Sequence, residues 1–367
     1  MRGIIRYNRH VDTHDRTAAE EHRAARQRAG LFDLAHRGRL EITGPDRVRW
    51  LHRLLTNDIT SLTPGRGCEA AFLTPQAKVL ALLSVHALPD SLLLDGEASR
   101  IGPLAVTLSK YRISEHVEIQ DRTPEFMLLA LQGPQAPAIL AAWAGEAEVP
   151  PRDLDHRSIT APEGPVLVIR NNAMGDPGFQ ILAPAASKAA VWGRLLAAGA
   201  PMGLVPCGPS AWESVRIEAG VPRDGVDVTD EVLLPETGLD RLVSTTKGCY
   251  LGQEFVVRIR DRGQVTRRLS RLALEGTAAA PAGALIRAGD RDVGAVTSSA
   301  FVPTQGRTLA LGYVHRDAAQ PGTVVTVMLP DGPCPAQVTG LAHAAGGGAA
   351  EIDVSSGSRG AVPNSPA

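Results

Sequence analysis

The character of the sequence changes near residue 267, and that change limits the available folds more than any other feature. Before it, segments with helical spacing of apolar residues alternate with short apolar runs that are typical of strands. After it come short alternating segments separated by Gly, Asp and Pro turns: RLSRLAL, ALIRA, VGAVTS, TLALGYV and TVVTVML. Short strands with no helices between them predict an all-β domain of the sandwich or barrel type. We therefore predict an α+β chain with more than one domain, as its 367 residues also favour.

A strand followed by Gly-Pro and a helix occurs twice before that boundary, in LEITGPDRVRWLHRLL and in LALQGPQAPAILAAWA. The repetition suggests internal duplication, as in a ferredoxin-like pair of half-motifs. We predict an α+β region over residues 1–265, built of two intertwined subdomains of which the second covers roughly residues 60–135. The β domain is expected over 266–344, and the Gly-, Ala-, Ser- and Pro-rich residues 345–367 are expected to form a disordered tail.

Composition argues against several classes of protein. The formal net charge is −1, so we expect no direct binding to nucleic acid. No apolar run is long enough to span a membrane, and the N-terminus lacks a signal peptide, which together favour the cytoplasm. The four cysteines are far apart with no CxxC pair, and the histidines lack ligand spacing, so neither a disulfide framework nor a metal site is expected.

Residues 247–269, KGCYLGQEFVVRIRDRGQVTRRL, carry the most distinctive chemistry. Cys249 lies between two glycines that allow close approach, beside Lys247 and shortly before three arginines. Positive charge near a thiol stabilises the thiolate and raises its reactivity. Two interpretations follow from the residues alone: a reactive thiol beside an anion-binding patch, or a buried cysteine at a turn beside a solvated basic face.

This segment resembles the signature of the YgfZ-type family. The residues that match it are Lys247, Gly248, Cys249, Tyr250, Gly252, Gln253, Glu254, Arg258 and Gly263. The mitochondrial relatives of YgfZ share the signature and act in late iron–sulphur cluster assembly. The resemblance implies that Cys249 is the catalytic residue and that iron–sulphur enzymes or assembly factors are the partners. Whether the thiol handles sulphur, a one-carbon unit or iron is left open.

Longer segments, in order from about residue 30 to 340, resemble the glycine-cleavage T proteins, which are aminomethyltransferases. These segments are GLFDLAHRGRLEITGPDRVRWLHRLLTNDI, LLALQGPQAPAIL, CGPSAWESVRIEAGVPRDGVDVTDEVLLPETGL and VGAVTSSAFVPTQGRTLALGYV. The resemblance implies a T-protein-like α+β fold, with a ferredoxin-like N-terminal region and a C-terminal β-barrel. It also implies a cavity that binds tetrahydrofolate or a one-carbon derivative.

The same resemblance suggests residues for that cavity. Arg216 and Glu218 match an R-x-E motif, whose carboxylate could accept two parallel hydrogen bonds from a pterin. A structural salt bridge at Glu218 is the alternative. Asn57 and Asp58 lie in a family-like T-N-D turn, for which a helix cap and turn is the alternative. Arg258 completes the predicted cofactor-binding set.

One departure from the family bears on activity. Aminomethyltransferases carry an acidic residue on the strand after the T-N-D turn, but the matching residues 76–84 include no Asp or Glu. We therefore expect no glycine-cleavage activity, and whether the chain is an enzyme stays open. We expect a tetrahydrofolate-binding protein that supports maturation or repair of iron–sulphur proteins. The alternatives are a folate-dependent one-carbon transferase acting on an unknown amine, and a non-catalytic adaptor stabilised by folate.

Overall fold

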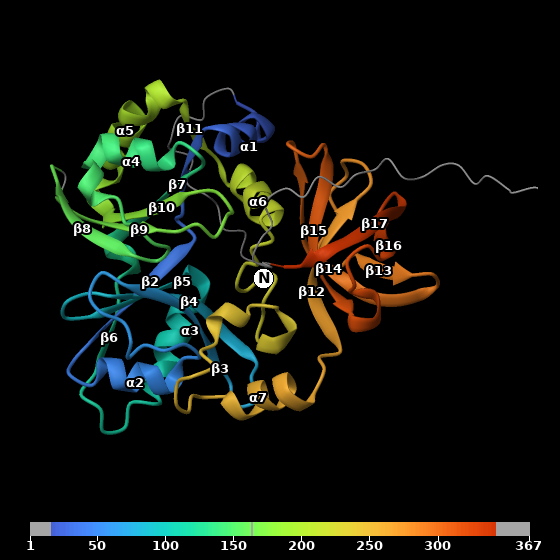
Figure 1. The fold of residues 1–367 in the computed structure, drawn as a ribbon, viewed down its shortest axis with the longest axis horizontal. Helices are drawn as coiled ribbons and strands as arrows, with labels where there is room; N and C mark the ends of the chain where they lie inside the picture. The colour runs from blue at the N-terminus through green and yellow to red at the C-terminus, as the bar shows by residue number, and fades with distance from the viewer. Residues whose placement is uncertain (1–15, 163, 343–367) are drawn as a thin grey trace, which may run out of the picture.

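The computed structural model describes residues 16–162 and 164–342, which form two sheets and a barrel (Figure 1). The tail predicted for residues 345–367 lies outside the described residues. Within the described part of the chain, every helix is too short or too polar to cross a bilayer. The fold is α+β, as the sequence predicted, with a closed barrel at its C-terminal end.

The first sheet has six strands in the order β11-β1-β7-β10-β9-β8. Their bounds are β1 Ala29–Asp33, β7 Phe126–Gln132, β8 His156–Ala161, β9 Gly164–Arg170, β10 Gly178–Pro184 and β11 Leu204–Cys207. The sheet packs on α4 (Ala136–Ala144) and α5 (Lys188–Gly199), whose apolar side chains share one buried core with its strands. Helices α1 (Ala18–Gln27) and α6 (Pro209–Glu218) lie together at the side nearest the barrel (Figure 1).

The second sheet has five strands in the order β3-β4-β5-β2-β6. Their bounds are β2 Arg37–Thr43, β3 Gly67–Leu73, β4 Val79–Ala87, β5 Leu92–Glu97 and β6 Glu118–Asp121, and the helices are α2 (Arg47–Leu54) and α3 (Ala98–Ser109). The chain enters this sheet directly from β1 and returns to the first sheet at β7, so the two sheets are intertwined. This sheet draws on residues 37–121, whereas the sequence placed the second subdomain at roughly 60–135, because the early strand β2 pairs with both β5 and β6.

The C-terminal strands close into a barrel in the order β12-β15-β14-β13-β16-β17, which confirms the predicted β domain. Their bounds are β12 Arg267–Leu274, β13 Leu285–Ala288, β14 Arg291–Val302, β15 Arg307–His315, β16 Val324–Leu329 and β17 Gly332–Leu341. The alternating pattern indicated the first five strands but not β17. Two prolines, Pro333 and Pro335, mask that strand, because proline lacks the N–H that a strand interior needs.

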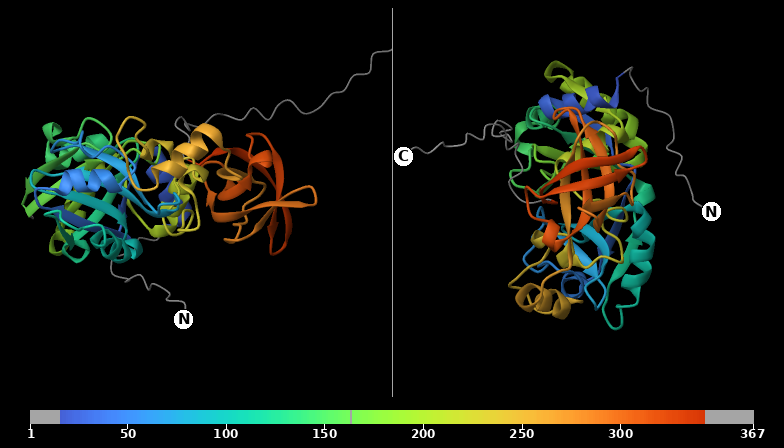
Figure 2. Two further views of the ribbon diagram at one scale, coloured as in Figure 1. Left: turned by 90° about the horizontal axis from the view of Figure 1, so that it is seen from below. Right: turned by 90° about the vertical axis from the view of Figure 1, so that its right-hand side faces the viewer.

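The barrel lies at one end of the molecule and is joined to the rest through α6 and its following loop (Figure 2). The fully buried Asp227 accepts hydrogen bonds from Arg216 at the end of α6 and from Thr297 and Ser298 of β14. Helix α7 (Gln253–Arg262) follows the long segment after α6, lies beside β3 and leads into the barrel strand β12 (Figure 1). The hydrogen bonds of Asp227 thus hold α6 between the first sheet and the barrel.

Candidate functional site

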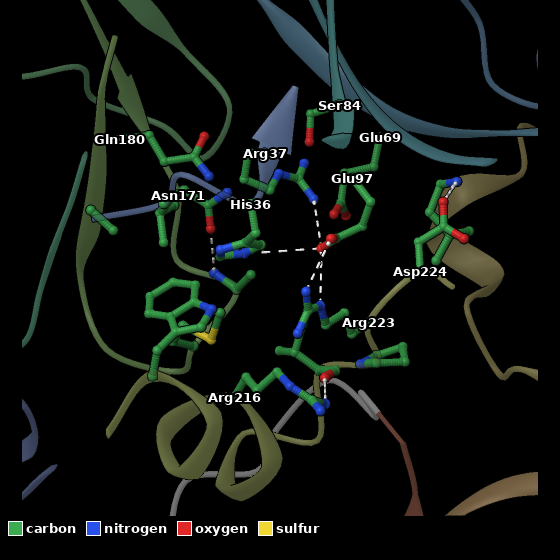
Figure 3. A pocket seen from close by; sticks show the side chains of 18 of the residues that line it. His36, Arg37, Glu69, Ser84, Glu97, Asn171, Gln180, Arg216, Arg223 and Asp224 are labelled. Atoms are coloured by element: carbon green, nitrogen blue, oxygen red, sulfur yellow. Dashed lines mark hydrogen bonds and ion pairs between the residues drawn. The ribbon is translucent and has the colours of Figure 1, made fainter. Parts of the chain in front are cut away.

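A cavity of about 130 Å³ lies where the two sheets meet α6 and the loop that follows it. Its apolar wall includes Leu82 from β4, Phe179 from β10 and Trp212 from α6. Its polar wall comes from the start of β2, the end of β5 and the loop after α6 (Figure 3). The polar side chains used below are His36, Arg37, Glu97, Arg216, Arg223 and Asp224.

The carboxylate of Glu97 occupies the middle of the polar wall (Figure 3). Its Oε1 lies 3.4 Å from Nε of Arg223, 3.9 Å from the His36 ring and 4.0 Å from Nη1 of Arg37. Burial raises the pKa of Glu97, although the two arginines oppose that rise. Burial and the Arg37 charge lower the pKa of His36 to about 3, so its imidazole is neutral at pH 7. The wall therefore offers both charged and neutral hydrogen-bonding groups to a ligand.

Strand β4 brings no carboxylate to this cavity. Leu82, Leu83 and Ser84 are the residues of β4 that line it. These are the positions at which the sequence lacked the acidic residue of aminomethyltransferases. The carboxylates that do line the cavity come from Glu69, Glu97 and Asp224.

The structure separates the two residues of the predicted R-x-E motif. Arg216 lines the cavity, and its guanidinium is held by Glu213 at 2.6 Å and Asp227 at 2.9 Å. Glu218 is not among the lining residues. Its carboxylate accepts from Nε of Arg26 at 2.5 Å, and its contacts also include His22 at 2.9 Å and Thr304 at 2.7 Å.

These contacts tie α1, α6 and the barrel together through Glu218. Burial would raise the pKa of this carboxyl, but the His22 hydrogen bond and the Arg26 charge outweigh it and hold the pKa at about 2. The geometry supports the structural salt bridge that the sequence left as an alternative. A folate contact at Glu218 stays a prediction.

Asn57 and Asp58 also lie outside the cavity lining. The Asn57 amide donates to the carbonyl of Glu69 at 2.7 Å, and Oδ1 of Asp58 accepts from the backbone N–H of Thr60 at 2.9 Å. Such bonds are typical of a side chain that fixes a turn. Gln180, which replaces an acid in the family-like strand, does line the cavity (Figure 3).

The signature segment is fastened to the C-terminal end of α2 by Lys247. Its ammonium donates to the carbonyls of Leu55 at 2.6 Å and Asn57 at 2.9 Å, and also to that of His52. The last carbonyls of a helix lack partners within the helix, so this ammonium satisfies groups that would otherwise be unpaired. Burial lowers the pKa of Lys247 to about 8.

Several other members of the signature position the start of α7. Gly252 precedes the helix with φ +84°, and a Cβ there would lie 2.6 Å from the carbonyl oxygen of Thr74. Oε1 of Gln253 accepts the backbone N–H of Tyr250 at 3.3 Å. Arg258 is paired with Glu254 one turn earlier, at 2.6 Å. This pairing offsets part of the positive charge that the sequence suggested. Arg258 lies on α7 and is not among the residues that line the cavity.

Cys249 itself is exposed, at the end of a groove along α7. The groove is lined by Cys249, Tyr250, Gln253, Glu254, Val257, Arg258 and Asp261, none of which lines the cavity. The interpretation of Cys249 as a buried cysteine is therefore wrong. Among the other thiols, Cys207 and Cys334 are buried, and burial raises the pKa of Cys68 to about 12.

Several residues of the cavity wall had no signal in the sequence. Arg223 and Asp224 belong to a PRDG turn, which turn chemistry alone explains. His36 lies in the turn just before β2 and Glu97 is the last residue of β5, and no motif marks either residue. Only the pairing of β2 with β5 and the return of the chain after α6 bring these four together.

The comparisons with known proteins agree with this fold. Residues 5–247 match the model of the GCVT N-terminal domain, and residues 267–343 match that of the glycine cleavage T-protein C-terminal barrel domain. The chain therefore belongs to the glycine-cleavage T-protein family, as its sequence predicted.

Named relatives cover most of the chain. It is 33% identical over 315 residues to the aminomethyltransferase of Bacillus pumilus, covering 84% of this chain and 86% of the relative. It is 32% identical over 299 residues to the putative transferase At1g60990, chloroplastic, of Arabidopsis thaliana, covering 81% and 68%. The crystal structure of the glycine cleavage system aminomethyltransferase T from Bartonella henselae has a TM-score of 0.79 and 25% identity, covering 89% of each chain.

Proposed function

We propose that this chain is a tetrahydrofolate-binding protein of the YgfZ-like branch, which supports maturation or repair of iron–sulphur proteins through the thiol of Cys249. The observation that carries the proposal is that some residues of the signature hold the loop in place while its cysteine is exposed. Lys247 and Gln253 each make a hydrogen bond that fixes the loop, and Gly252 takes the φ of +84° at the turn into α7, whereas Cys249 is exposed. A loop anchored in this way holds its exposed thiol in a fixed place, as a functional site requires.

The cavity supports the folate part of the proposal. At about 130 Å³ it is smaller than the ~300 Å³ at which pockets for drug-sized ligands begin, so it suits one ring system with the remainder of the ligand outside. Its mixture of an aromatic wall and buried charged groups suits a flat, hydrogen-bonding heterocycle. The family relationship makes a reduced folate, as tetrahydrofolate or a one-carbon derivative, the ligand of choice.

Deletion of the gene followed by assay of several [4Fe–4S] enzymes tests the role of the thiol. We expect their activities to fall, and to recover when the wild-type chain is supplied but not when Cys249→Ala is supplied. The control is Cys68→Ser, which removes another thiol outside the groove and should restore activity. Full recovery with Cys249→Ala would favour the adaptor alternative, in which folate only stabilises the protein.

A second candidate function is folate-dependent one-carbon transfer to or from an unknown amine. Relatives named aminomethyltransferase favour it, whereas the missing acid on β4 argues against glycine cleavage itself. Incubating the chain with tetrahydrofolate and a panel of methylated amines, and measuring methylene-tetrahydrofolate, decides the matter. Ammonia release from an aminomethylated lipoyl carrier protein should be absent. Release at about 1 per second, an ordinary enzyme rate, would refute that expectation.

A further inference from the structure

Asp224 brings a carboxylate into the cavity from an unexpected element. It lies in the loop after α6, and only 5% of its surface is exposed. Its Oδ2 accepts the backbone N–H of Leu82, on β4, at 3.0 Å. This hydrogen bond fixes the carboxylate beside the stretch of β4 that, by the family resemblance, lacks the acidic residue of aminomethyltransferases.

The second oxygen of Asp224 has no hydrogen bond within the described residues. Oδ1 is buried, and the nearest cation, Nε of Arg100, lies 3.5 Å away without the alignment of a hydrogen bond. A buried acceptor left unpaired costs free energy that a hydrogen-bond donor recovers. Burial raises the pKa of Asp224, although the Leu82 N–H and Arg100 oppose that rise. Oδ1 of Asp224 is thus a buried hydrogen-bond acceptor that a donor on a ligand could satisfy.

We propose that Asp224 recognises an N–H group of the ligand in this cavity, so that the loop after α6 supplies the carboxylate that β4 lacks. The ligand class is a heterocycle with ring or exocyclic N–H donors. The inference rests on the proposed function, since it assumes that the cavity binds a reduced folate. Glu97 differs from Asp224 because its carboxylate already faces three cationic or imidazole groups within 4.0 Å.

Calorimetric titration with tetrahydrofolate tests the proposal. Asp224→Asn keeps the shape and an oxygen for the Leu82 N–H, and should weaken binding tenfold or more, the scale of a charge-assisted hydrogen bond. The matched control is Asp155→Asn, which makes the same substitution at a buried carboxylate that lies outside the cavity lining and is paired with Arg66 at 2.9 Å. Its affinity should stay within about twofold of wild type. Equal losses in both variants, or no loss in Asp224→Asn, overturn the proposal.

A second substitution that restores affinity would distinguish ligand binding by Asp224 from a role that only stabilises β4. Leu82 lines the cavity, so Leu82→Asp placed in the Asp224→Asn background should restore most of the lost affinity. A structural role for Asp224 predicts no recovery, and that result overturns the proposal.

The crystal structure of the wild-type complex needs no variant and is read independently of variant folding. We expect a ligand nitrogen within about 3.2 Å of Oδ1, and a ligand that leaves Oδ1 uncontacted overturns the proposal. If wild-type protein binds no tetrahydrofolate at all, the proposed function fails first. Binding by the wild type with unchanged affinity in Asp224→Asn defeats this inference alone.

Discussion

Replacing Gly252 by alanine should loosen the Cys249 loop, and the matched control is Gly248→Ala, because Gly248 lies in the same motif but an added Cβ there has open space. At φ +84° an L-residue costs about 1–2 kcal/mol, and displacing the Thr74 carbonyl, 2.6 Å from the new Cβ, costs about 1–3 kcal/mol more. Alanine also stiffens the unfolded chain, which returns about 0.4–1 kcal/mol. The net expectation is a destabilisation of about 1–4.6 kcal/mol, with a middle value of about 3 kcal/mol. Around Gly248 no atom lies within 4 Å of an added Cβ, so Gly248→Ala should change stability by no more than about 0.5 kcal/mol.

Hydrogen–deuterium exchange of residues 247–262 measures this effect locally, which suits a chain of several domains better than one global unfolding midpoint. A loss of about 3 kcal/mol should speed exchange in that segment by roughly 150-fold where exchange follows the opening equilibrium. Exchange in β9 and β10 of the first sheet, whose buried core is separate from that of this loop, serves as the internal reference. Equal protection in the two variants would refute the geometric account of Gly252.

Two further predictions concern reactivity and acid stability. Limiting iodoacetamide on the native protein should modify Cys249 first, because it is exposed while the other thiols are buried or partly buried; mass spectrometry that finds Cys68, Cys207 or Cys334 modified faster contradicts the working-thiol proposal. Glu218 has a folded pKa of about 2 against an ordinary value of 4.5, so it stabilises the fold above pH 4.5 and this contribution is lost as the pH falls from 4.5 towards 2. Glu218→Gln should therefore lower the free energy of unfolding by about 2–3 kcal/mol at pH 7, and by much less at pH 2.5, which a lower melting temperature would report. An equal loss at both pH values would assign the effect to packing instead.

The sequence predicted those parts of the fold whose signal lies within a single element. Alternation revealed the first five barrel strands, while Pro333 and Pro335 concealed the sixth. The signature identified the Cys249 loop, but the Glu254–Arg258 pair, which offsets part of its positive charge, depends on helical geometry. The sequence shows that Lys247 and several arginines are close to Cys249 along the chain. Only the structure shows that Lys247 binds backbone carbonyls and that Arg258 is paired with Glu254.

The polar wall of the cavity could not be predicted, because its members are distant in sequence and come from separate elements. Glu97 ends β5, whereas Arg223 and Asp224 follow α6. Their meeting depends on how the second sheet is inserted into the first. Resemblance did supply Arg216 as a lining residue, but it also suggested Glu218, which the fold directs to a salt bridge with Arg26.

Titration of the purified chain with tetrahydrofolate under reducing conditions tests the central claim most directly. We expect saturable binding of one ligand per chain, measured by calorimetry, and a rise in melting temperature that grows with ligand concentration. At 100 times the dissociation constant, such binding adds about 2.7 kcal/mol to the stability of the native state. Neither heat nor a thermal shift with tetrahydrofolate, up to millimolar concentration, would contradict the assignment of the cavity as a folate site.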